Sequence, residues 1–279
     1  MSHTHDFSPK TVAELVRRGF YSTVFQPIRD TKSLTIYGYE ALLRGPRGTP
    51  LAQPGTLFHG NHMLSMELIS EIDLACVGSA IRNGRKLARY ARLFINVCGE
   101  TLWYIAHHAR EWFRTLEVLE LPPERVVFEV SGNMEWTQAR AIAQHLQRIR
   151  AAGIQIALDD VGTLYPWLYH VLWLEPDYLK VERGFVEGIE HSPRKQAIVD
   201  GLNRLAQRVD ARLIIEGIET RAEWQTVQDL DVPFVQGFWL GLPLPADKWM
   251  QTEMHRTCSN SPVPGFIREP LRFVRPPQN

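Results

Sequence analysis

The chain has 279 residues, a formal net charge of zero, 44% hydrophobic residues and 22% charged residues. This is the composition of an ordinary globular protein with a sizeable core, and it excludes a chain that is disordered throughout. The balanced charge also excludes a global electrostatic attraction to DNA or to an anionic membrane surface, so an anionic substrate would have to be bound by local groups.

The sequence shows no sign of a membrane or secretory protein. No apolar run approaches the roughly 20 residues that a membrane helix needs, and the first residues lack the charged and apolar regions of a signal peptide. The three cysteines, Cys76, Cys98 and Cys258, are odd in number and share no metal-type spacing, which suits a reducing compartment. We therefore expect a cytoplasmic protein with neither a membrane segment nor a DNA partner.

The predicted elements begin with a short helix at 10–20, followed by strands at 21–28 and 34–44 that a turn at 29–33 joins into a hairpin. Helices and strands then alternate. Further helices are expected at 64–90, 100–118, 135–152, 194–209 and 219–229, and further strands at 92–97, 125–130, 155–160, 178–181, 212–217 and 234–238. Apolar strands separated by helices indicate a buried parallel sheet, and this number of strands favours a closed α/β barrel.

The end of the chain differs in composition from the rest. Residues 257–279 are rich in proline and cannot form a regular element. We interpret residues 1–256 as one barrel domain and the remainder as a tail that lies on the barrel or is disordered. Its spaced apolar residues, among them Phe266 and Phe273, also suit a peptide that docks on a protein partner.

Two adjacent carboxylates, Asp159 and Asp160, end the apolar run that starts at Gln155. Like charges this close repel unless a cation lies beside them, and a divalent metal is the commonest such partner. The simpler alternative is that Asp160 caps a following helix. The ends of the other strands favour the metal.

A polar residue stands at the end of each strand from the second to the eighth, and the carboxyl ends of parallel barrel strands converge on one face. These residues are Glu40 with Arg44, Asn96, Glu129, Asp159 with Asp160, Lys180, Glu216 and Gln236. The oxygen ligands among them suit Mg²⁺ or Mn²⁺. Glu40, Asn96, Glu129 and Asp159 would form one metal site, and Asp160 with Glu216 could complete a second. A pair of metals activates water in phosphoester hydrolysis, and Lys180 and Arg44 would add positive charge toward the phosphate.

These motifs resemble, in order, those of the EAL family, the bacterial cyclic di-GMP phosphodiesterase domain. The resemblance rests on Glu40-Ala41-Leu42 with Arg44, Asn96 in Phe-Ile-Asn-Val, Glu129 in Phe-Glu-Val, Asp159-Asp160-Val-Gly-Thr, Leu179-Lys180-Val, Glu216-Gly-Ile-Glu219-Thr and Val-Gln236-Gly-Phe. It spans residues 20–250.

The resemblance implies a TIM-type (β/α)8 barrel with an antiparallel first strand, and hydrolysis of cyclic di-GMP to pGpG with Mg²⁺ or Mn²⁺. It implies that Glu40, Asn96, Glu129 and Asp159 bind metal, and that Asp160 belongs to a second metal site. Lys180 and Glu216 would position and deprotonate the attacking water. Arg44 and Gln236 would contact the substrate or the ligand residues, and Glu219 would contact the ligand residues without binding the metal itself. A homodimer is a further expectation of the family.

The chain departs from the family pattern around the loop after the fifth strand. Gly132 replaces a glutamate that anchors this loop, Leu164 replaces a glycine, and Pro166 fixes a backbone angle. Glu135 is close enough in sequence to replace the anchor. A catalytically weak or inactive EAL domain, acting as a cyclic di-GMP receptor or a protein-interaction regulator, is therefore the alternative to an active enzyme. The joint presence of Lys180 and Glu216 favours the enzyme.

Overall fold

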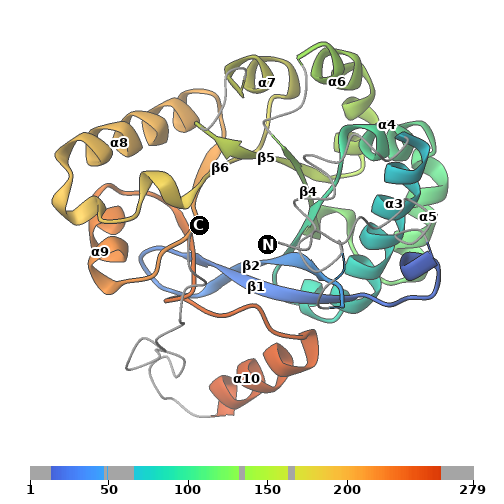
Figure 1. The fold of residues 1–279 in the computed structure, drawn as a ribbon, viewed down its shortest axis with the longest axis horizontal. Coiled ribbons are helices and arrows are strands. Elements are labelled where there is room, and N and C mark those ends of the chain that lie inside the picture. Colours follow the sequence, from blue (N-terminus) through green and yellow to red (C-terminus); the bar gives the residue numbers. More distant parts are fainter. Residues whose placement is uncertain (1–13, 47–48, 50–65, 132–135, 163–166, 259–279) are drawn as a thin grey trace, which may run out of the picture.

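A computed structural model describes residues 14–46, 49, 66–131, 136–162 and 167–258 of the chain. Within these ranges eight strands, paired in sequence order, close into a barrel with helices around the outside (Figure 1). The strands are β1 (Ser22–Asp30), β2 (Ile36–Arg44), β3 (Arg92–Asn96), β4 (Val126–Ser131), β5 (Gln155–Val161), β6 (Tyr178–Val181), β7 (Arg212–Ile215) and β8 (Phe234–Gln236).

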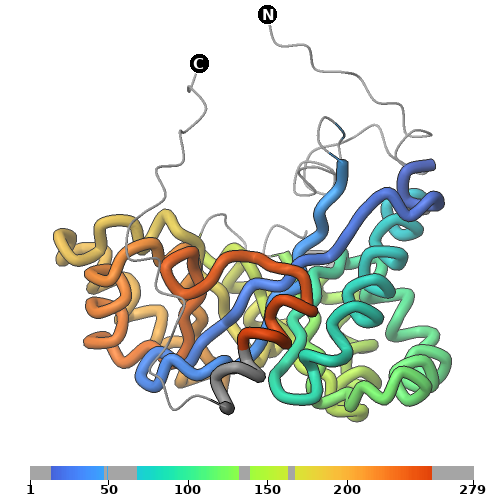
Figure 2. The backbone as a smooth tube through the Cα atoms, turned by 90° about the horizontal axis from the view of Figure 1, so that it is seen from below, coloured from blue at the N-terminus to red at the C-terminus, as the bar shows by residue number. Residues whose placement is uncertain are grey.

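The first strand runs against both of its neighbours. β1 pairs antiparallel with β2 and with β8, whereas every pair from β2–β3 to β7–β8 is parallel. This confirms the predicted TIM-type barrel with an antiparallel first strand. Because β2 pairs with β3 only as far as Ala41, the end of the β1–β2 hairpin rises beyond the rest of the barrel (Figure 2).

Helices cover the barrel wall wherever a parallel strand follows. They are α3 (Met66–Gly84), α4 (Gly99–His107), α5 (Ala109–Val118), α6 (Trp136–Ala151), α7 (Trp167–Leu174), α8 (Pro193–Arg208), α9 (Arg221–Asp229) and α10 (Ala246–Cys258). No helix connects β1 to β2, and the outer side of this hairpin is contacted by α10. Its Trp249 donates a hydrogen bond from Nε1 to the Phe25 carbonyl, 2.6 Å away. Among the described residues no helix has both the length and the apolar character needed to cross a bilayer.

The helix predictions were correct in type and less accurate in extent. The expected helix 100–118 is two helices, because His108 leaves the helical conformation at φ −103° and ψ 32°. The expected helix 64–90 ends at Gly84 and is followed by a 3-10 turn at Leu87–Arg89. Two helices, α7 and α10, were not predicted from the sequence. The segment of α7 reads Trp-Leu-Tyr-His-Val-Leu-Trp-Leu, an almost uniformly apolar run without helical periodicity.

The described ranges leave out several predicted features. The departures from the family pattern around the loop after the fifth strand lie outside the described residues. They are Gly132, Leu164 and Pro166. Glu135, which is close enough in sequence to replace the anchor, and the tail from residue 259 onwards also lie outside them. The helix α10 continues to Cys258, so a regular element extends two residues past the predicted boundary at 256. The division into a barrel and a tail otherwise stays a prediction from sequence.

The barrel interior begins with an apolar layer near the amino-terminal ends of the parallel strands. Its buried members are Ile28, Phe94, Val127, Ala157, Tyr178, Ile214 and Phe234. A larger core of aliphatic side chains lies on the other side of the wall, between strands and helices. This division follows from the two-residue period of a strand, which directs alternate side chains to opposite faces.

The Tyr178 hydroxyl links side chains from three other strands at the end of the barrel where the parallel strands begin. It donates a hydrogen bond to Gln155 Oε1 at 2.9 Å and accepts one from Arg212 Nη2 at 2.8 Å. It also lies 2.5 Å from the Tyr37 hydroxyl. We expect Tyr178→Phe to lower the free energy of unfolding by about 1–2 kcal/mol, because Arg212 loses an acceptor and Gln155 loses a donor. Urea unfolding would measure it. Tyr90→Phe, at a side chain that is 75% exposed, is the control, and an equal loss there would contradict the argument.

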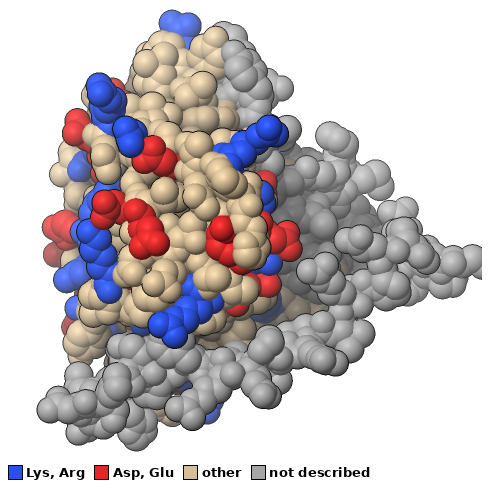
Figure 3. Space-filling model, turned by 90° about the vertical axis from the view of Figure 1, so that its left-hand side faces the viewer, with Lys and Arg blue, Asp and Glu red and all other residues tan. Residues whose placement is uncertain are grey.

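The surface over α8 and α9 carries Lys and Arg interspersed with Asp and Glu, without a large patch of one sign (Figure 3). Some of these charges are paired, as Arg204 is with Asp200 at 3.0 Å on α8. This face therefore has the mixed charge of an ordinary solvated surface.

Candidate functional site

A polar layer lies next to the apolar one, toward the carboxyl ends of the parallel strands. Each strand, or for Glu216 the residue directly after β7, supplies one side chain to this layer, and most of these follow an apolar inward residue by two positions, where the two-residue period returns to the inner face. Its members are Gln26, Glu40, Asn96, Glu129, Asp159, Lys180, Glu216 and Gln236. The structure thus brings together all the predicted strand-end residues except Asp160, Arg44 and Glu219.

Lys180 occupies the centre of this layer. Its side chain is fully buried, and Nζ lies 2.6 Å from Glu216 Oε1 and 2.8 Å from Glu129 Oε1. Glu40 Oε1 and Asp159 Oδ1 follow at 3.6 and 3.7 Å. Lys180 Nζ and Glu129 Oε1 are within ion-pair distance but lack the angles of a hydrogen bond, so we treat this contact as charge attraction. One ammonium group therefore faces four carboxylates.

Two amides hold the carboxylates in place. Asn96 Nδ2 donates to Glu40 Oε1 at 3.2 Å and to Glu129 Oε2 at 3.1 Å. Gln236 Nε2 donates to Glu40 Oε2 at 2.6 Å. Both oxygens of Glu40 thus have a donor, and its orientation is set by β3 and β8 together.

Gln26 was not among the site residues predicted from the sequence. Its Oε1 accepts from Gln236 Nε2 at 3.3 Å and its Nε2 donates to the Gly241 carbonyl at 3.2 Å. Gln26 lies directly opposite Glu40 in the β1–β2 register. Continuing the inward face of the predicted hairpin from Glu40 onto the first strand would have found it.

Burial and mutual repulsion shift the pKa values in this layer. Burial raises the pKa of Glu129 well above its ordinary value, and Lys180 offsets this only in part. Burial, opposed by Lys180, also raises the pKa of Asp159 and brings the pKa of Glu216 to about 8. Burial alone would lower the pKa of Lys180, but the surrounding carboxylates raise it well above the usual lysine value. The layer therefore carries more negative charge than Lys180 can balance.

This excess predicts how the stability of the metal-free protein depends on pH. Between the ordinary pKa of 4.5 and about 8, the folded state holds a proton on Glu216 that the unfolded chain has lost. The free energy of unfolding therefore falls as the pH rises through this window. We expect a lower melting temperature in EDTA at about pH 8.5 than at about pH 6. Glu216→Gln should make this dependence shallower, and an unchanged slope would contradict the assignment.

The paired aspartates lie in β5, which extends one residue past the predicted strand end at 160. Leu158 pairs with Leu179 and Val161 pairs with Val181, so two residues of β5, Asp159 and Asp160, stand opposite one residue of β6, Lys180. This two-to-one pairing is a β-bulge, and it describes the backbone rather than the direction of the side chains. Asp160 has φ 56°, a left-handed conformation that aspartate tolerates better than most residues. Its Oδ2 lies 3.4 Å from Ser131 Oγ, outside the carboxylate group around Lys180. Because β5 continues through Val161, Asp160 is followed by a strand residue and is not the N-cap of a helix, so that alternative is wrong.

Two predicted residues lie apart from the polar layer. Arg44 is exposed at the end of the rising hairpin, where Nη1 donates to the Leu43 carbonyl at 2.7 Å. Glu219 pairs with Arg183 at 3.1 Å, and Arg183 also donates to the Gly217 carbonyl. These contacts hold the turn that follows Glu216, so Glu219 acts on the site only through that turn.

The layer fits a divalent cation by its donors and by its charge. Within the described residues no group of three His, Cys, Asp or Glu side chains is already placed to hold a metal ion. The carboxylates of the layer contact Lys180 Nζ instead. Glu40, Glu129 and Asp159 nevertheless supply carboxylate oxygens of the kind that Mg²⁺ and Mn²⁺ prefer, and Asn96 would add its amide oxygen if the amide turned from the Nδ2 contacts it makes here. A divalent cation would also offset the excess negative charge.

The family model of the EAL domain matches residues 10–243. This chain belongs to the EAL family. It is 24% identical over 250 residues to the probable cyclic di-GMP phosphodiesterase PdeN of Escherichia coli, a match that covers 87% of the chain and 47% of PdeN. Its match to the bifunctional diguanylate cyclase/cyclic di-GMP phosphodiesterase MucR of Pseudomonas aeruginosa is 32% identical and covers 46% of the chain and 19% of MucR. The chain thus matches less than half the length of either relative.

Solved structures share the fold of this chain. BlrP1 of Klebsiella pneumoniae, solved with calcium and cyclic di-GMP, has a TM-score of 0.70 at 27% identity, covering 81% of this chain and 56% of BlrP1. The same protein was also solved with manganese and cyclic di-GMP. The EAL enzyme Bd1971, with a TM-score of 0.76 at 21% identity over 88% of this chain and 67% of Bd1971, supports the fold alone.

Proposed function

We propose that the protein is a cyclic di-GMP phosphodiesterase that hydrolyses its substrate to pGpG with a divalent metal. The observation that carries this proposal is the polar layer, in which Lys180 is surrounded by Glu40, Glu129, Asp159 and Glu216 within 2.6–3.7 Å. Relatives named as cyclic di-GMP phosphodiesterases, and BlrP1 solved with cyclic di-GMP and metal, support the choice of substrate.

The roles proposed for the site residues are those that the family resemblance implies, and the geometry of the polar layer supports them. Glu40, Asn96, Glu129 and Asp159 would hold Mg²⁺ or Mn²⁺, and Asp160 on its bulge would serve a second ion. Such ions polarise the phosphate and lower the pKa of bound water. Arg44, on the exposed end of the hairpin, would attract the anionic substrate, and Gln236 would keep Glu40 oriented.

Lys180 and Glu216 are proposed to handle the attacking water. Glu216 Oε1 and Lys180 Nζ are 2.6 Å apart, so a water oxygen that hydrogen-bonds Nζ also lies within reach of the carboxylate. A divalent cation in the polar layer would favour the ionised form of Glu216, and this carboxylate would take the water proton as the oxygen bonds to phosphorus. The bond from phosphorus to the 3′ oxygen breaks, that oxygen is protonated, and the phosphate stays on the 5′ end of pGpG.

A second candidate function is a cyclic di-GMP receptor with little or no turnover. The observation that favours it is the position of Asp160, whose carboxylate lies beside Ser131 rather than in the group around Lys180. Two departures from the family pattern point the same way: Gly132 follows Ser131 in sequence, and Leu164 stands four residues after Asp160. A receptor would still need Arg44 and the polar layer to bind the dinucleotide.

One assay separates the two functions. Purified protein is incubated with cyclic di-GMP and Mn²⁺ or Mg²⁺, the products are separated by chromatography, and binding is measured in parallel by calorimetry in Ca²⁺. We expect pGpG to accumulate with time and to be absent in EDTA. Binding without pGpG in either metal would establish the receptor, and neither binding nor turnover would refute both functions.

A further inference from the structure

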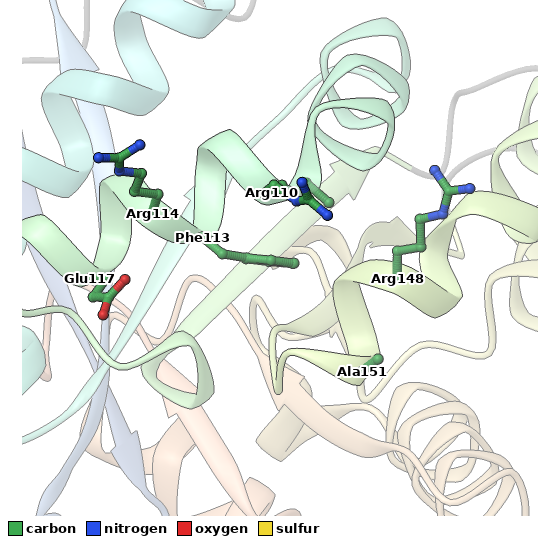
Figure 4. Close-up of a pocket in the computed structure, with 7 residues that line it drawn as sticks. Arg110, Phe113, Arg114, Glu117, Arg148 and Ala151 are labelled. Atoms are coloured by element: carbon green, nitrogen blue, oxygen red, sulfur yellow. The ribbon is translucent and has the colours of Figure 1, made fainter.

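A groove on the outside of the barrel lies between α5 and α6, with a volume of about 660 Å³. Phe113 points from α5 into the space between the two helices, toward Ala151 at the end of α6 (Figure 4). Three arginines stand along the groove, Arg110 and Arg114 on α5 and Arg148 on α6. The groove thus has an apolar floor and a basic margin.

The arginines of the groove are available to a ligand. All three are exposed, and within the described ranges no hydrogen bond or ion pair involves their guanidinium groups. The only acidic side chain in the lining is Glu117. This differs from the α8 surface, where Arg204 pairs with Asp200. The groove therefore has a net positive charge that the described protein does not neutralise.

The groove is remote from the polar layer. α5 ends at Val118, eight residues before β4 begins, and α6 ends at Ala151, four residues before β5 begins. Glu117 and Ala151 accordingly lie toward the amino-terminal ends of the strands, whereas the polar layer lies toward their carboxyl ends. A molecule in the groove leaves access to that layer open.

We propose that the α5–α6 groove binds an acidic peptide segment of a partner protein, with an apolar side chain on Phe113 and carboxylates on Arg110, Arg114 and Arg148. The shape favours a peptide over a small molecule, because the groove is open and its arginines are spread along two helices, whereas small-ligand sites enclose most of their ligand. Charge excludes the chain's own tail, since residues 259–279 contain three arginines and one glutamate. This proposal is independent of the proposed enzymatic function.

The test uses the full chain and fluorescence anisotropy with a labelled 14-residue peptide that has leucine at helical spacing among Glu and Asp. A second peptide with Lys at every acidic position is the matched probe. We expect only the acidic peptide to bind, and added salt to weaken the binding. Arg110→Glu with Arg148→Glu should weaken it about tenfold or more, and Phe113→Ala should also weaken it.

Arg194→Glu, the same charge change at an exposed position on α8, is the control and should bind as the parent does. Circular dichroism melting verifies that each variant is folded. Absence of acidic-peptide binding, equal binding of both peptides, or an equal loss in the control would overturn the proposal. Sedimentation with vesicles of phosphatidylserine and phosphatidylcholine completes the test. Arginine-dependent binding to these vesicles, with none to the peptide, would assign the groove to anionic lipid instead.

Discussion

Glu40→Ala and Asp159→Ala are each expected to lower the rate of pGpG formation by at least about a hundredfold. Each substitution removes a carboxylate from the oxygen ligands that converge on the centre of the polar layer. The same variants should lose the rise in melting temperature that Mn²⁺ produces in the parent protein, because a ligand stabilises the folded state only when it binds there. The first effect is measured by product chromatography and the second by thermal melting.

Asp200→Ala is the matched control for both measurements. Asp200 is a carboxylate on α8 that pairs with Arg204, remote from the polar layer. It should keep both the turnover and the Mn²⁺-dependent rise in melting temperature. If Glu40→Ala retained parental turnover, the metal assignment would fail. If it lost turnover but kept the full response to Mn²⁺, Glu40 would act on the substrate instead of on the metal.

Lys180→Met is expected to lower the free energy of unfolding of the metal-free protein by about 3–5 kcal/mol, because it leaves buried carboxylates without their cation. Lys180 Nζ is the only ammonium or guanidinium nitrogen of the described residues within 4.0 Å of Glu129 or Glu216. Urea unfolding in EDTA would measure the loss. Mn²⁺ should restore part of the stability, since a divalent cation supplies the missing charge. Turnover should stay about a hundredfold or more below that of the parent even with metal.

Lys248→Met tests whether the effect belongs to the site. Lys248 is exposed on α10, and the same substitution there should change the free energy of unfolding by no more than about 0.5 kcal/mol. The interpretation fails if Lys180→Met unfolds no more easily than Lys248→Met at pH values where Glu129 and Glu216 are ionised. Recovery by Mn²⁺ of stability without turnover would separate the charge role of Lys180 from its catalytic one.

Most of the polar layer could be predicted from local patterns. Apolar strands with a two-residue period end in polar residues at Asn96, Glu129 and Gln236, and the parallel barrel brings strand ends together whatever the loops do. Gln26 escaped because β1 runs in the opposite direction, so its inward polar residue does not stand at a strand end. The break at His108 was missed because the apolar pattern continues through it.

The sequence by itself determined the barrel, the direction of its first strand and which residue types reach its carboxyl face, because side-chain alternation and helix periodicity are local properties of the chain. Only the tertiary structure decided that Lys180 stands at the centre of four carboxylates, since that position depends on the closure of all the strands. It also decided that Asp159 enters the layer while Asp160 turns toward Ser131, because the bulge opposite Lys180 arises from the pairing of β5 with β6. Pairing between strands, more than the order of residues along one strand, thus sets the chemistry of the site.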